Sequence, residues 1–318
     1  MELIYDGNKK EYDELDKFLD DHKAPPWRVQ KSSSGEDYKP SPEEVDIVNL
    51  SLYLRRPILV SGDPGVGKST LAKSVAVTLD CGDVLHWQIT THSILKDGLY
   101  EYDAIARLQD VKLGKDNKNI GEYVRLGALG SAFASKSMRV VLIDEIDKSD
   151  IDFPNNLLHV LEEREFDIPE LARTGVNTHE VYDDNGQKIE ITLENSKLKC
   201  EVFPLIIMTS NAEREFPPAF KRRVLMHNIE LPSDREELKD RLNEIIISHL
   251  SDAKKLNNTT EDIKNSLDKI INNFIDKVQK DKSKLSIDQL MNSVFLELED
   301  IDTQSEERIK KIWHNLSE

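Results

Sequence analysis

Apolar and polar residues are arranged along this chain in two ways, and the change between them separates two regions. Before Pro232, short apolar runs alternate with stretches that have helical spacing. After Pro232, apolar residues recur at three- and four-residue intervals, which is typical of amphipathic helices packed in a bundle. The pattern predicts an α/β domain followed by a separate helical domain.

The apolar runs of the first region have the character of strands buried on both faces. Ser41 and Pro42 mark the start of a helix that runs to residue 54, because serine caps free amides and proline suits a first turn. A second helix is predicted at 69–79. The predicted strands are 57–60, 84–90, 138–144, 203–210 and 224–231. Alternating strands and helices predict a five-stranded parallel sheet with helices on both faces.

A β-hairpin is predicted between the third and fourth of these strands. Residues 188–193 alternate with period two, and the strand-like run 179–182 precedes them. Asn185-Gly186 lies between the two runs, and this pair is a strong hairpin signal. Beyond the sheet, helices are predicted at 235–250, 261–280, 286–299 and 306–316.

Three parts of the chain follow from these patterns. Residues 1–40 have little apolar periodicity and include a stretch of Ser, Gly, Pro and charged residues, as linkers do. We therefore expect an N-terminal extension at 1–40, an α/β domain at 41–232 and a helical domain at 233–318.

Composition and charge narrow the class of protein. The 318 residues are 38% hydrophobic and 32% charged, with a formal net charge of −17. This charge argues against a general binder of nucleic acids or anionic membranes, because both attract basic surfaces. The chain has no apolar run of about 18 residues and no signal-peptide core at its N-terminus. Cys81 and Cys200 form no metal or redox motif, and we expect a cytoplasmic protein.

The first chemical signal is LVSGDPGVGKST at residues 59–70. Glycine permits positive φ, so a glycine-rich turn can direct its backbone amides at an anion. Gly62, Gly67, Lys68 and Ser69 satisfy the P-loop pattern, in which the lysine reaches the β- and γ-phosphates and the hydroxyl ligates Mg²⁺. The residues predicted to bind ATP are Gly62, Asp63, Pro64, Gly65, Val66, Gly67, Lys68, Ser69 and Thr70.

The second signal is VVLIDEID at residues 140–147. A buried strand delivers Asp144 and Glu145 at its carboxyl end, where open α/β sheets bind their ligands. Asp144 is expected to hold Mg²⁺ with Ser69, and Glu145 to orient and polarise a water. An acidic strand end about 75 residues after a P-loop is the spacing of a Walker B strand.

Three weaker signals remain. Asn211 ends a strand, and it either caps a turn or contacts the attacking water and a γ-phosphate oxygen. Arg222 and Arg223 are either a solvated pair or a finger that enters a neighbouring nucleotide site. Tyr100 and Tyr102 either grip a substrate or pack inside an insert.

This ordered set of motifs resembles the AAA+ ATPases, and within them the MoxR branch. The resemblance covers about residues 41–300, and its segments are PPWR, DGLYEYDAIARLQ, DEIDKSD and FPPAFKRR. It implies a P-loop NTPase (AAA+) fold with a C-terminal helical lid, an insert at about 91–124 and a projecting hairpin at about 176–200. It also implies that Asn211 is sensor 1, and that Arg223, with Arg222 beside it, is the finger.

The same resemblance implies a function. Members of this branch are ATP-hydrolysing, Mg²⁺-dependent subunits of hexameric rings that remodel or switch protein partners. Similar chains occur in bacterial conflict or antiphage defence neighbourhoods, often beside von Willebrand A-type partners. Two alternatives are a nucleotide-dependent scaffold with negligible hydrolysis, which the intact Glu145 disfavours, and a DNA-acting motor, which the charge of −17 disfavours.

The sequence departs from the branch at two places. Where MoxR proteins typically read DEINR, this chain reads Asp144-Glu145-Ile146-Asp147-Lys148. The sensor 2 arginine has no evident counterpart, and Ile287 or Asp288 falls near its expected position. Lid movement driven by nucleotide is therefore either weak or dependent on another cation.

Overall fold

The computed structural model describes residues 25, 35, 38–114, 119–250, 261–279, 285–299 and 312–313. The predicted N-terminal extension and the last predicted helix lie almost entirely outside these residues. The described chain divides into two compact units. One consists of residues 34–62 and 67–229, and the other contains residues 63–66 with the helices that follow Ile229.

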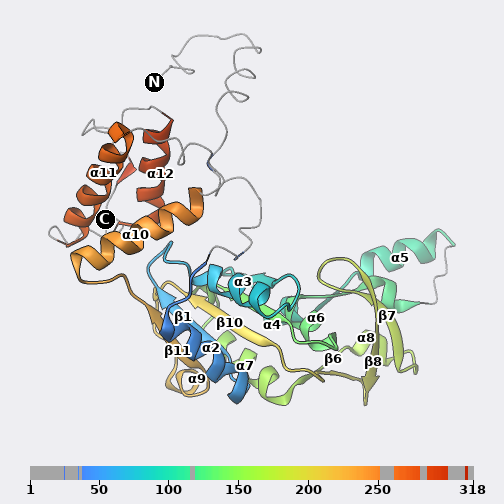
Figure 1. The fold of residues 1–318 in the computed structure, drawn as a ribbon. Coiled ribbons are helices and arrows are strands. Elements are labelled where there is room, and N and C mark those ends of the chain that lie inside the picture. Colours follow the sequence, from blue (N-terminus) through green and yellow to red (C-terminus); the bar gives the residue numbers. More distant parts are fainter. Residues whose placement is uncertain are drawn as a thin grey trace, which may run out of the picture. The chain divides into compact units, whose positions relative to one another are not determined.

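The first unit contains the predicted sheet (Figure 1). Its strands are β1 (Ile58–Gly62), β2 (Leu85–Gln88), β5 (Val140–Asp144), β10 (Leu205–Ser210) and β11 (Leu225–Ile229). They lie in the order β11-β1-β10-β5-β2, and every neighbouring pair is parallel. The predicted five-stranded parallel sheet is confirmed, and the carboxyl ends of its strands lie along one edge.

The prediction that all five strands are buried on both faces is wrong for two of them. Residues of β1, β5 and β10 are buried over most of each strand, whereas buried and exposed residues alternate in β2 and exposed residues recur in β11. β2 and β11 are the two edges of the sheet. The helical layers cover the centre of a sheet better than its edges, so one face of an edge strand stays near water.

Helices cover both faces of this sheet. The helices of the unit are α2 (Pro42–Leu54), α3 (Lys68–Thr78), α4 (Leu95–Leu99), α5 (Ala104–Lys112), α6 (Ala128–Ala134), α7 (Phe153–Glu163), α8 (Pro169–Ala172) and α9 (Pro218–Lys221), with the 3₁₀ turns η2 (Ile120–Tyr123) and η3 (Ile146–Lys148). The predicted start of α2 is confirmed, because Ser41 and Glu44 form a reciprocal capping box.

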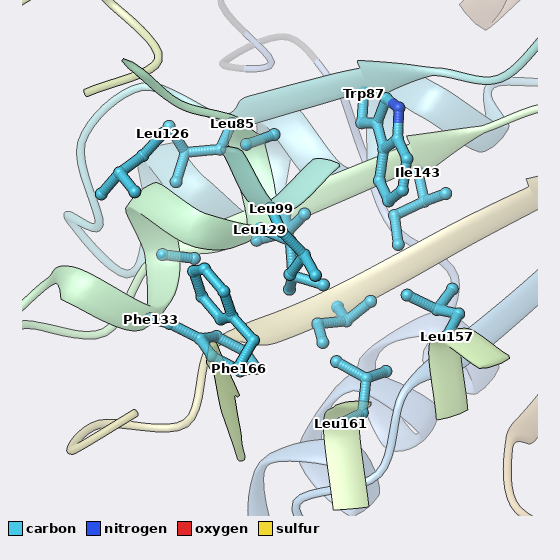
Figure 2. Packing of buried hydrophobic residues seen from close by; sticks show 14 of the residues in the cluster. Leu85, Trp87, Leu99, Leu126, Leu129, Phe133, Ile143, Leu157, Leu161 and Phe166 are labelled. Carbon is cyan, nitrogen blue, oxygen red and sulfur yellow. The ribbon is translucent and has the colours of Figure 1, made fainter. Parts of the chain in front are cut away.

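Alternate residues of each central strand point to opposite faces, and each face has its own core. Ile58 and Val60 belong to a buried cluster with residues of α2 and α3. Leu59, between them, belongs to a second cluster with residues of α6 and α7. Figure 2 shows part of that second cluster, in which Phe133 of α6 and Leu157 of α7 pack on the same side as Ile143 of β5.

The predicted insert and the predicted hairpin form one further sheet. Its order is β3-β4-β7-β8-β9-β6, and its strands are β3 (Tyr100–Tyr102), β4 (Val124–Leu126), β6 (Glu165–Asp167), β7 (Thr178–Tyr182), β8 (Lys188–Glu194) and β9 (Lys197–Lys199). The hairpin prediction is confirmed, since β7 and β8 pair antiparallel around a turn in which Gly186 has φ 77°. The insert joins this hairpin where Arg125 pairs with Tyr182.

Tyr100 packs inside this insert and is not available to grip a substrate. It is 6% exposed, and its ring stacks on that of Phe166 with centroids 6.2 Å apart. Its hydroxyl donates a hydrogen bond to Glu170 at 2.9 Å. Tyr102 is half-buried, and its hydroxyl accepts a hydrogen bond from Arg107. For Tyr100, the packing interpretation of the sequence is therefore the right one.

The second unit contains three of the predicted C-terminal helices, α10 (Arg235–Leu250), α11 (Glu261–Gln279) and α12 (Ile287–Leu298). Their apolar faces form a core that includes Phe274 and Leu290. The indole of Trp313 donates hydrogen bonds to the Gln289 carbonyl and the Ser293 hydroxyl, 3.2 and 2.8 Å away. No helix in the described part of the chain is long and apolar enough to cross a membrane.

Candidate nucleotide site

The glycine-rich loop connects the end of β1 to the start of α3. Gly62, Gly65 and Gly67 have φ values of 148°, 86° and 101°, which residues with side chains rarely adopt. Lys68 begins α3 and is 8% exposed, and its Nζ donates a hydrogen bond to the Gly62 carbonyl at 2.7 Å. The loop therefore turns back on itself and holds the lysine at its centre.

Tyr38 lies directly against this loop, which the sequence did not indicate. A Cβ atom on Gly67 would come within 2.9 Å of the Tyr38 ring. The Tyr38 hydroxyl donates a hydrogen bond to Glu44, the buried acid of the α2 capping box. Glycine is therefore required at position 67 for its positive φ and also for the space that the tyrosine ring occupies.

Asp144 is the last residue of β5, and its carboxylate has three polar partners. Ser69 and Thr209 both donate their hydroxyl hydrogens to Oδ1, the former at 2.9 Å, and His86 Nε2 lies 3.4 Å from Oδ2. Burial alone would raise the pKa of Asp144, but the hydrogen bonds from His86, Thr209 and Ser69 outweigh it and lower the pKa. The carboxylate is therefore charged at neutral pH and lies beside the hydroxyl of the P-loop serine.

Glu145 follows in a left-handed conformation with φ 59°. Its backbone amide donates to Thr209 Oγ1 at 2.9 Å, which fixes the turn after β5. Its side-chain Oε2 accepts two hydrogen bonds, one from Gln88 at 2.6 Å and one from Lys148 at 2.7 Å. Gln88 ends β2, which is the strand beside β5, so its contact follows from the strand order, whereas Lys148 lies three residues after Glu145 in the same turn.

Asn211 follows the end of β10, between the loop of β1 and the acids of β5 in the strand order. Its backbone amide donates to Asp147 Oδ2 at 2.9 Å. Within the described residues its side-chain amide makes no hydrogen bond, so the amide is available to a ligand. The structure thus brings Lys68, Ser69, Asp144, Glu145 and Asn211 to one edge of the sheet.

Arg222 and Arg223 lie at the amino ends of the strands, opposite the carboxyl ends that carry the residues above. They precede β11, whose first residue, Leu225, pairs with Ile58 at the start of β1. Strand β1 extends over about 13 Å from Ile58 to Gly62, at about 3.3 Å per residue. The arginines are therefore separated from the P-loop of their own chain by the length of the sheet.

The two arginines line a cavity of about 380 Å³ at that edge. Arg223 Nε lies 2.8 Å from Glu162 Oε1, and the Arg56 guanidinium donates to the carbonyls of Arg222 and Arg223. Among the described residues, the Arg222 guanidinium has no hydrogen-bond or ion-pair partner. The remaining lining residues are Arg55, Pro57, Leu158, Leu161, Arg164 and Phe203.

A parallel sheet with a glycine-rich loop after one strand and an acidic pair after another defines the class of P-loop NTPases. The family model for the AAA domain, dynein-related subfamily, matches residues 57–224, which is more than half of the chain. The chain therefore belongs to this family of AAA+ ATPase domains. A search of curated protein sequences gives no significant match.

Two solved structures are similar to the chain at low identity. NtrX from Brucella abortus, crystallised in complex with ADP, is 13% identical with a TM-score of 0.44, over 95% of this chain and 56% of that one. A closed-state cryo-EM reconstruction of Hsp104 with ATPγS and FITC casein is 18% identical with a TM-score of 0.39, over 78% of this chain and 40% of that one. The chain thus spans about half the length of these two proteins.

Proposed function

We propose that this chain is an ATP-hydrolysing, ring-forming AAA+ subunit of the MoxR branch that remodels or switches a protein partner. The observation that carries the proposal is the contact between Ser69 and Asp144, which joins the P-loop to the acidic end of β5. Lys68 and the amides of Gly62–Thr70 would bind the phosphates of ATP, and Ser69 and Asp144 would hold Mg²⁺.

The residues present fit these two ligands. Three glycines in the positive-φ region allow the loop to turn its amides toward phosphate oxygens, and Lys68 adds a positive charge. Mg²⁺ prefers hard oxygen ligands, and the hydroxyl of Ser69 and the ionised Asp144 supply two of them. Bound MgATP would supply the phosphoryl group that is transferred to water.

Glu145 and Asn211 would act on that water. Glu145 Oε1, the oxygen that Gln88 and Lys148 do not contact, is the acceptor for a proton of the water. Asn211 would fix the position of the water or of a phosphate oxygen with its uncommitted amide. Both residues follow strands whose carboxyl ends lie at the same edge as the P-loop.

Arg222 and Arg223 would serve the nucleotide site of an adjacent subunit. Their place at the amino edge of the sheet supports this, because the nucleotide residues of the same chain lie at the carboxyl edge. A contact between unlike edges of two copies is heterologous, and such contacts close into rings when the rotation allows. We propose a hexamer, in which residues 233–318 form the lid of each AAA+ domain at 41–232.

The MoxR assignment and the partner rest on sequence resemblance. The segments DGLYEYDAIARLQ and FPPAFKRR support the branch, and the sheet that joins the insert to the hairpin supports an elaborated AAA+ domain. The partner would be a cytoplasmic protein, of the von Willebrand A type or a defence effector, in an antiphage system. Co-purification from the native host with identification by mass spectrometry tests this part.

Steady-state phosphate release by the purified chain tests the activity. We expect Mg²⁺-dependent release that is lost in Glu145→Gln and is not stimulated by DNA. The variant Glu201→Gln, an exposed glutamate outside the site, serves as the matched control and should release phosphate at the wild-type rate. If the wild type releases no phosphate at any protein concentration, the alternative of a nucleotide-dependent scaffold is favoured. Strong stimulation of release by DNA would instead identify a DNA-acting motor.

A further inference from the structure

A short loop carries Arg222 and Arg223 from the end of α9 to the start of β11. α9 is a single turn that ends at Lys221, and the carbonyls that follow a helix end need partners from elsewhere. Phe220 and Val224, on either side of the two arginines, are 0% and 4% exposed. The loop is therefore held at its two ends, and its exposed middle contains the residues proposed to reach a neighbouring subunit.

Arg56 supplies partners for the carbonyls of this loop. Its Nε donates a hydrogen bond to the Arg223 carbonyl at 3.2 Å. One of its terminal nitrogens donates to the carbonyl of Arg222 and, at 3.5 Å, to that of Val224. One guanidinium thus spans three consecutive carbonyls, which suits a planar group with several donors in fixed directions better than the point charge of a lysine. Arg56 is half-buried, so water has only partial access to these contacts.

The backbone of Arg56 is itself fixed by its surroundings. α2 ends just before Arg55, which turns the chain in the left-handed conformation with φ 54°. The hydroxyl of the buried Ser51 donates to the Arg56 carbonyl at 2.5 Å, and the Arg56 amide donates to the Ser51 carbonyl at 3.4 Å. Next along the chain, the Pro57 carbonyl accepts the Leu225 amide at 2.8 Å. The guanidinium therefore extends to the loop from a turn whose backbone is held by α2 and β11.

The side chains of the two arginines do little to hold the loop. Arg222 has no described partner, and the ion pair of Arg223 with Glu162 joins side chains that are 51% and 49% exposed. Exposed ion pairs of this kind contribute little free energy. A group that acts on a reacting phosphate loses much of its effect when it is misplaced by about 1 Å. The backbone from which the arginines project must therefore be fixed by other residues.

We propose that Arg56 is a positioning residue for the arginine finger. It fixes the backbone of residues 222–224, so that the finger guanidinium projects toward the nucleotide site of the adjacent subunit. Arg56 itself contacts no nucleotide. It acts with the arginine side of the subunit contact, although it precedes the P-loop in the same chain. This inference rests on the proposed role of Arg222 and Arg223 at a neighbouring site.

Steady-state kinetics, at a protein concentration that saturates the activity per subunit, give the first test. Arg56→Met should lower kcat about ten-fold, the scale of one hydrogen bond to a charged group, with the KM for ATP unchanged. Arg56→Lys keeps the charge without the planar fork and should recover only part of this loss.

Arg139→Met is the matched control for this test. The Arg139 guanidinium also donates to a backbone carbonyl, that of Asp83 at 2.8 Å, and Arg139 precedes β5 outside the arginine-lined cavity. Its substitution should leave kcat at the wild-type value. A wild-type kcat in Arg56→Met, or an equal loss of kcat in Arg139→Met, would overturn the proposal.

Mixtures of variants distinguish positioning of the finger from damage to the chain's own site. Arg56→Met mixed with Glu145→Gln should recover activity, because one interface combines an intact Glu145 with an anchored finger. Arg56→Met mixed with the chain that carries Arg222→Ala and Arg223→Ala should recover none, because neither chain then supplies a positioned finger. A purely structural defect at the nucleotide site of the Arg56→Met chain would give the reverse pattern and would overturn the proposal.

Hydrogen exchange without nucleotide separates this inference from the proposed function. The amides of Arg223 and Leu225 donate to backbone carbonyls at 2.9 and 2.8 Å, so their exchange reports loosening of the loop. Arg56→Met should speed exchange at residues 218–225 about ten-fold and leave β5 unchanged, whereas Arg139→Met should leave residues 218–225 unchanged. Wild-type exchange in Arg56→Met would overturn the anchor whatever the kinetics. Faster exchange in a chain whose wild type hydrolyses no ATP would show that the anchor exists and that the proposed ATPase function has failed.

Discussion

The hydroxyl of Ser69 donates a hydrogen bond to the carboxylate of Asp144 at 2.9 Å, across 75 positions of sequence. Ser69 lies in the helix after β1 and Asp144 ends β5, and these two strands are not neighbours, because β10 lies between them. Thr209, on the intervening strand β10, donates a hydrogen bond to the same carboxylate. Residues on or after three strands thus hold the two proposed metal ligands beside each other.

The Lys68 side chain tests the phosphate-binding role of the loop. Lys68→Ala should weaken ATP binding by about 10- to 100-fold, because a hydrogen bond to a charged group contributes about 1.5–3 kcal/mol. The fold should survive, since alanine favours the helical backbone that position 68 adopts at the start of α3. Isothermal titration calorimetry measures the affinity, and the exposed lysine variant Lys136→Ala is the control. Equal affinities for ATP in wild type and Lys68→Ala would rule out the P-loop assignment.

Glu145→Gln separates binding from chemistry. Glutamine keeps the shape of the side chain and can still accept a hydrogen bond, but it cannot take a proton. We expect ATP affinity within about two-fold of wild type and hydrolysis slower by about 10²-fold or more, the usual scale for loss of a general base. Calorimetry and phosphate release on the same preparation measure the two quantities. Hydrolysis near the wild-type rate would mean that another group activates the water.

The parts of the site that sequence predicts are those that depend on adjacent residues. Gly67, Lys68 and Ser69 form a local motif between a strand and a helix, and Asp144 ends an apolar run, so short windows reveal both. The contact of Gln88 with Glu145 has no such signal, because it joins residues 57 positions apart through the pairing of β2 with β5. Strand order is a property of the whole domain, and short windows do not contain it.

The same reason applies to the second sheet. The Asn185-Gly186 turn and the alternation of β8 predict a hairpin, and the hairpin is present. Strands β3 and β4 have three residues each, which is too short for a readable alternation, and β4 joins the hairpin through one residue pair. The sequence therefore locates the insert as a stretch of chain but does not predict its pairing with the hairpin.

Gly98 tests the packing of the insert against the central sheet. A Cβ atom at this position would lie 2.2 Å from the ring of Trp87, which is 8% exposed on β2. Because the ring is confined by the core, Gly98→Ala should lower the free energy of unfolding by about 3 kcal/mol, at the upper end of the range for overpacking. Gly114→Ala, at a position with φ 69° where the described residues beyond its chain neighbours place no atom within 4 Å of the added Cβ, should cost about 1 kcal/mol of backbone strain. Urea unfolding of both variants measures the difference, and equal midpoints would contradict the packing described.

Substitution of Arg222 and Arg223 tests whether subunits assemble into a ring, on which the proposed remodelling activity depends. Arg222 and Arg223 lie at the amino ends of the strands, separated from the P-loop of their own chain by the length of β1, about 13 Å. A chain with Arg222→Ala and Arg223→Ala should therefore bind ATP normally and lose hydrolysis, because a finger arginine acts mainly on charge in the transition state. Arg173→Ala, an exposed arginine elsewhere in the unit, is the control.

Mixing the arginine-deficient chain with Glu145→Gln gives the decisive measurement. If the site is shared, one of the two mixed interfaces contains an intact Glu145 from one chain and intact arginines from the next, so some hydrolysis should return. Activity per subunit should also rise with protein concentration, as an assembly-dependent site requires. Single variants then assign the finger. Arg223 must leave its ion pair with Glu162 to reach a neighbour, whereas Arg222 has no described partner to leave. A turnover number independent of concentration, with no recovery in mixtures that co-assemble, would mean that each chain hydrolyses ATP alone or acts as a monomeric nucleotide switch.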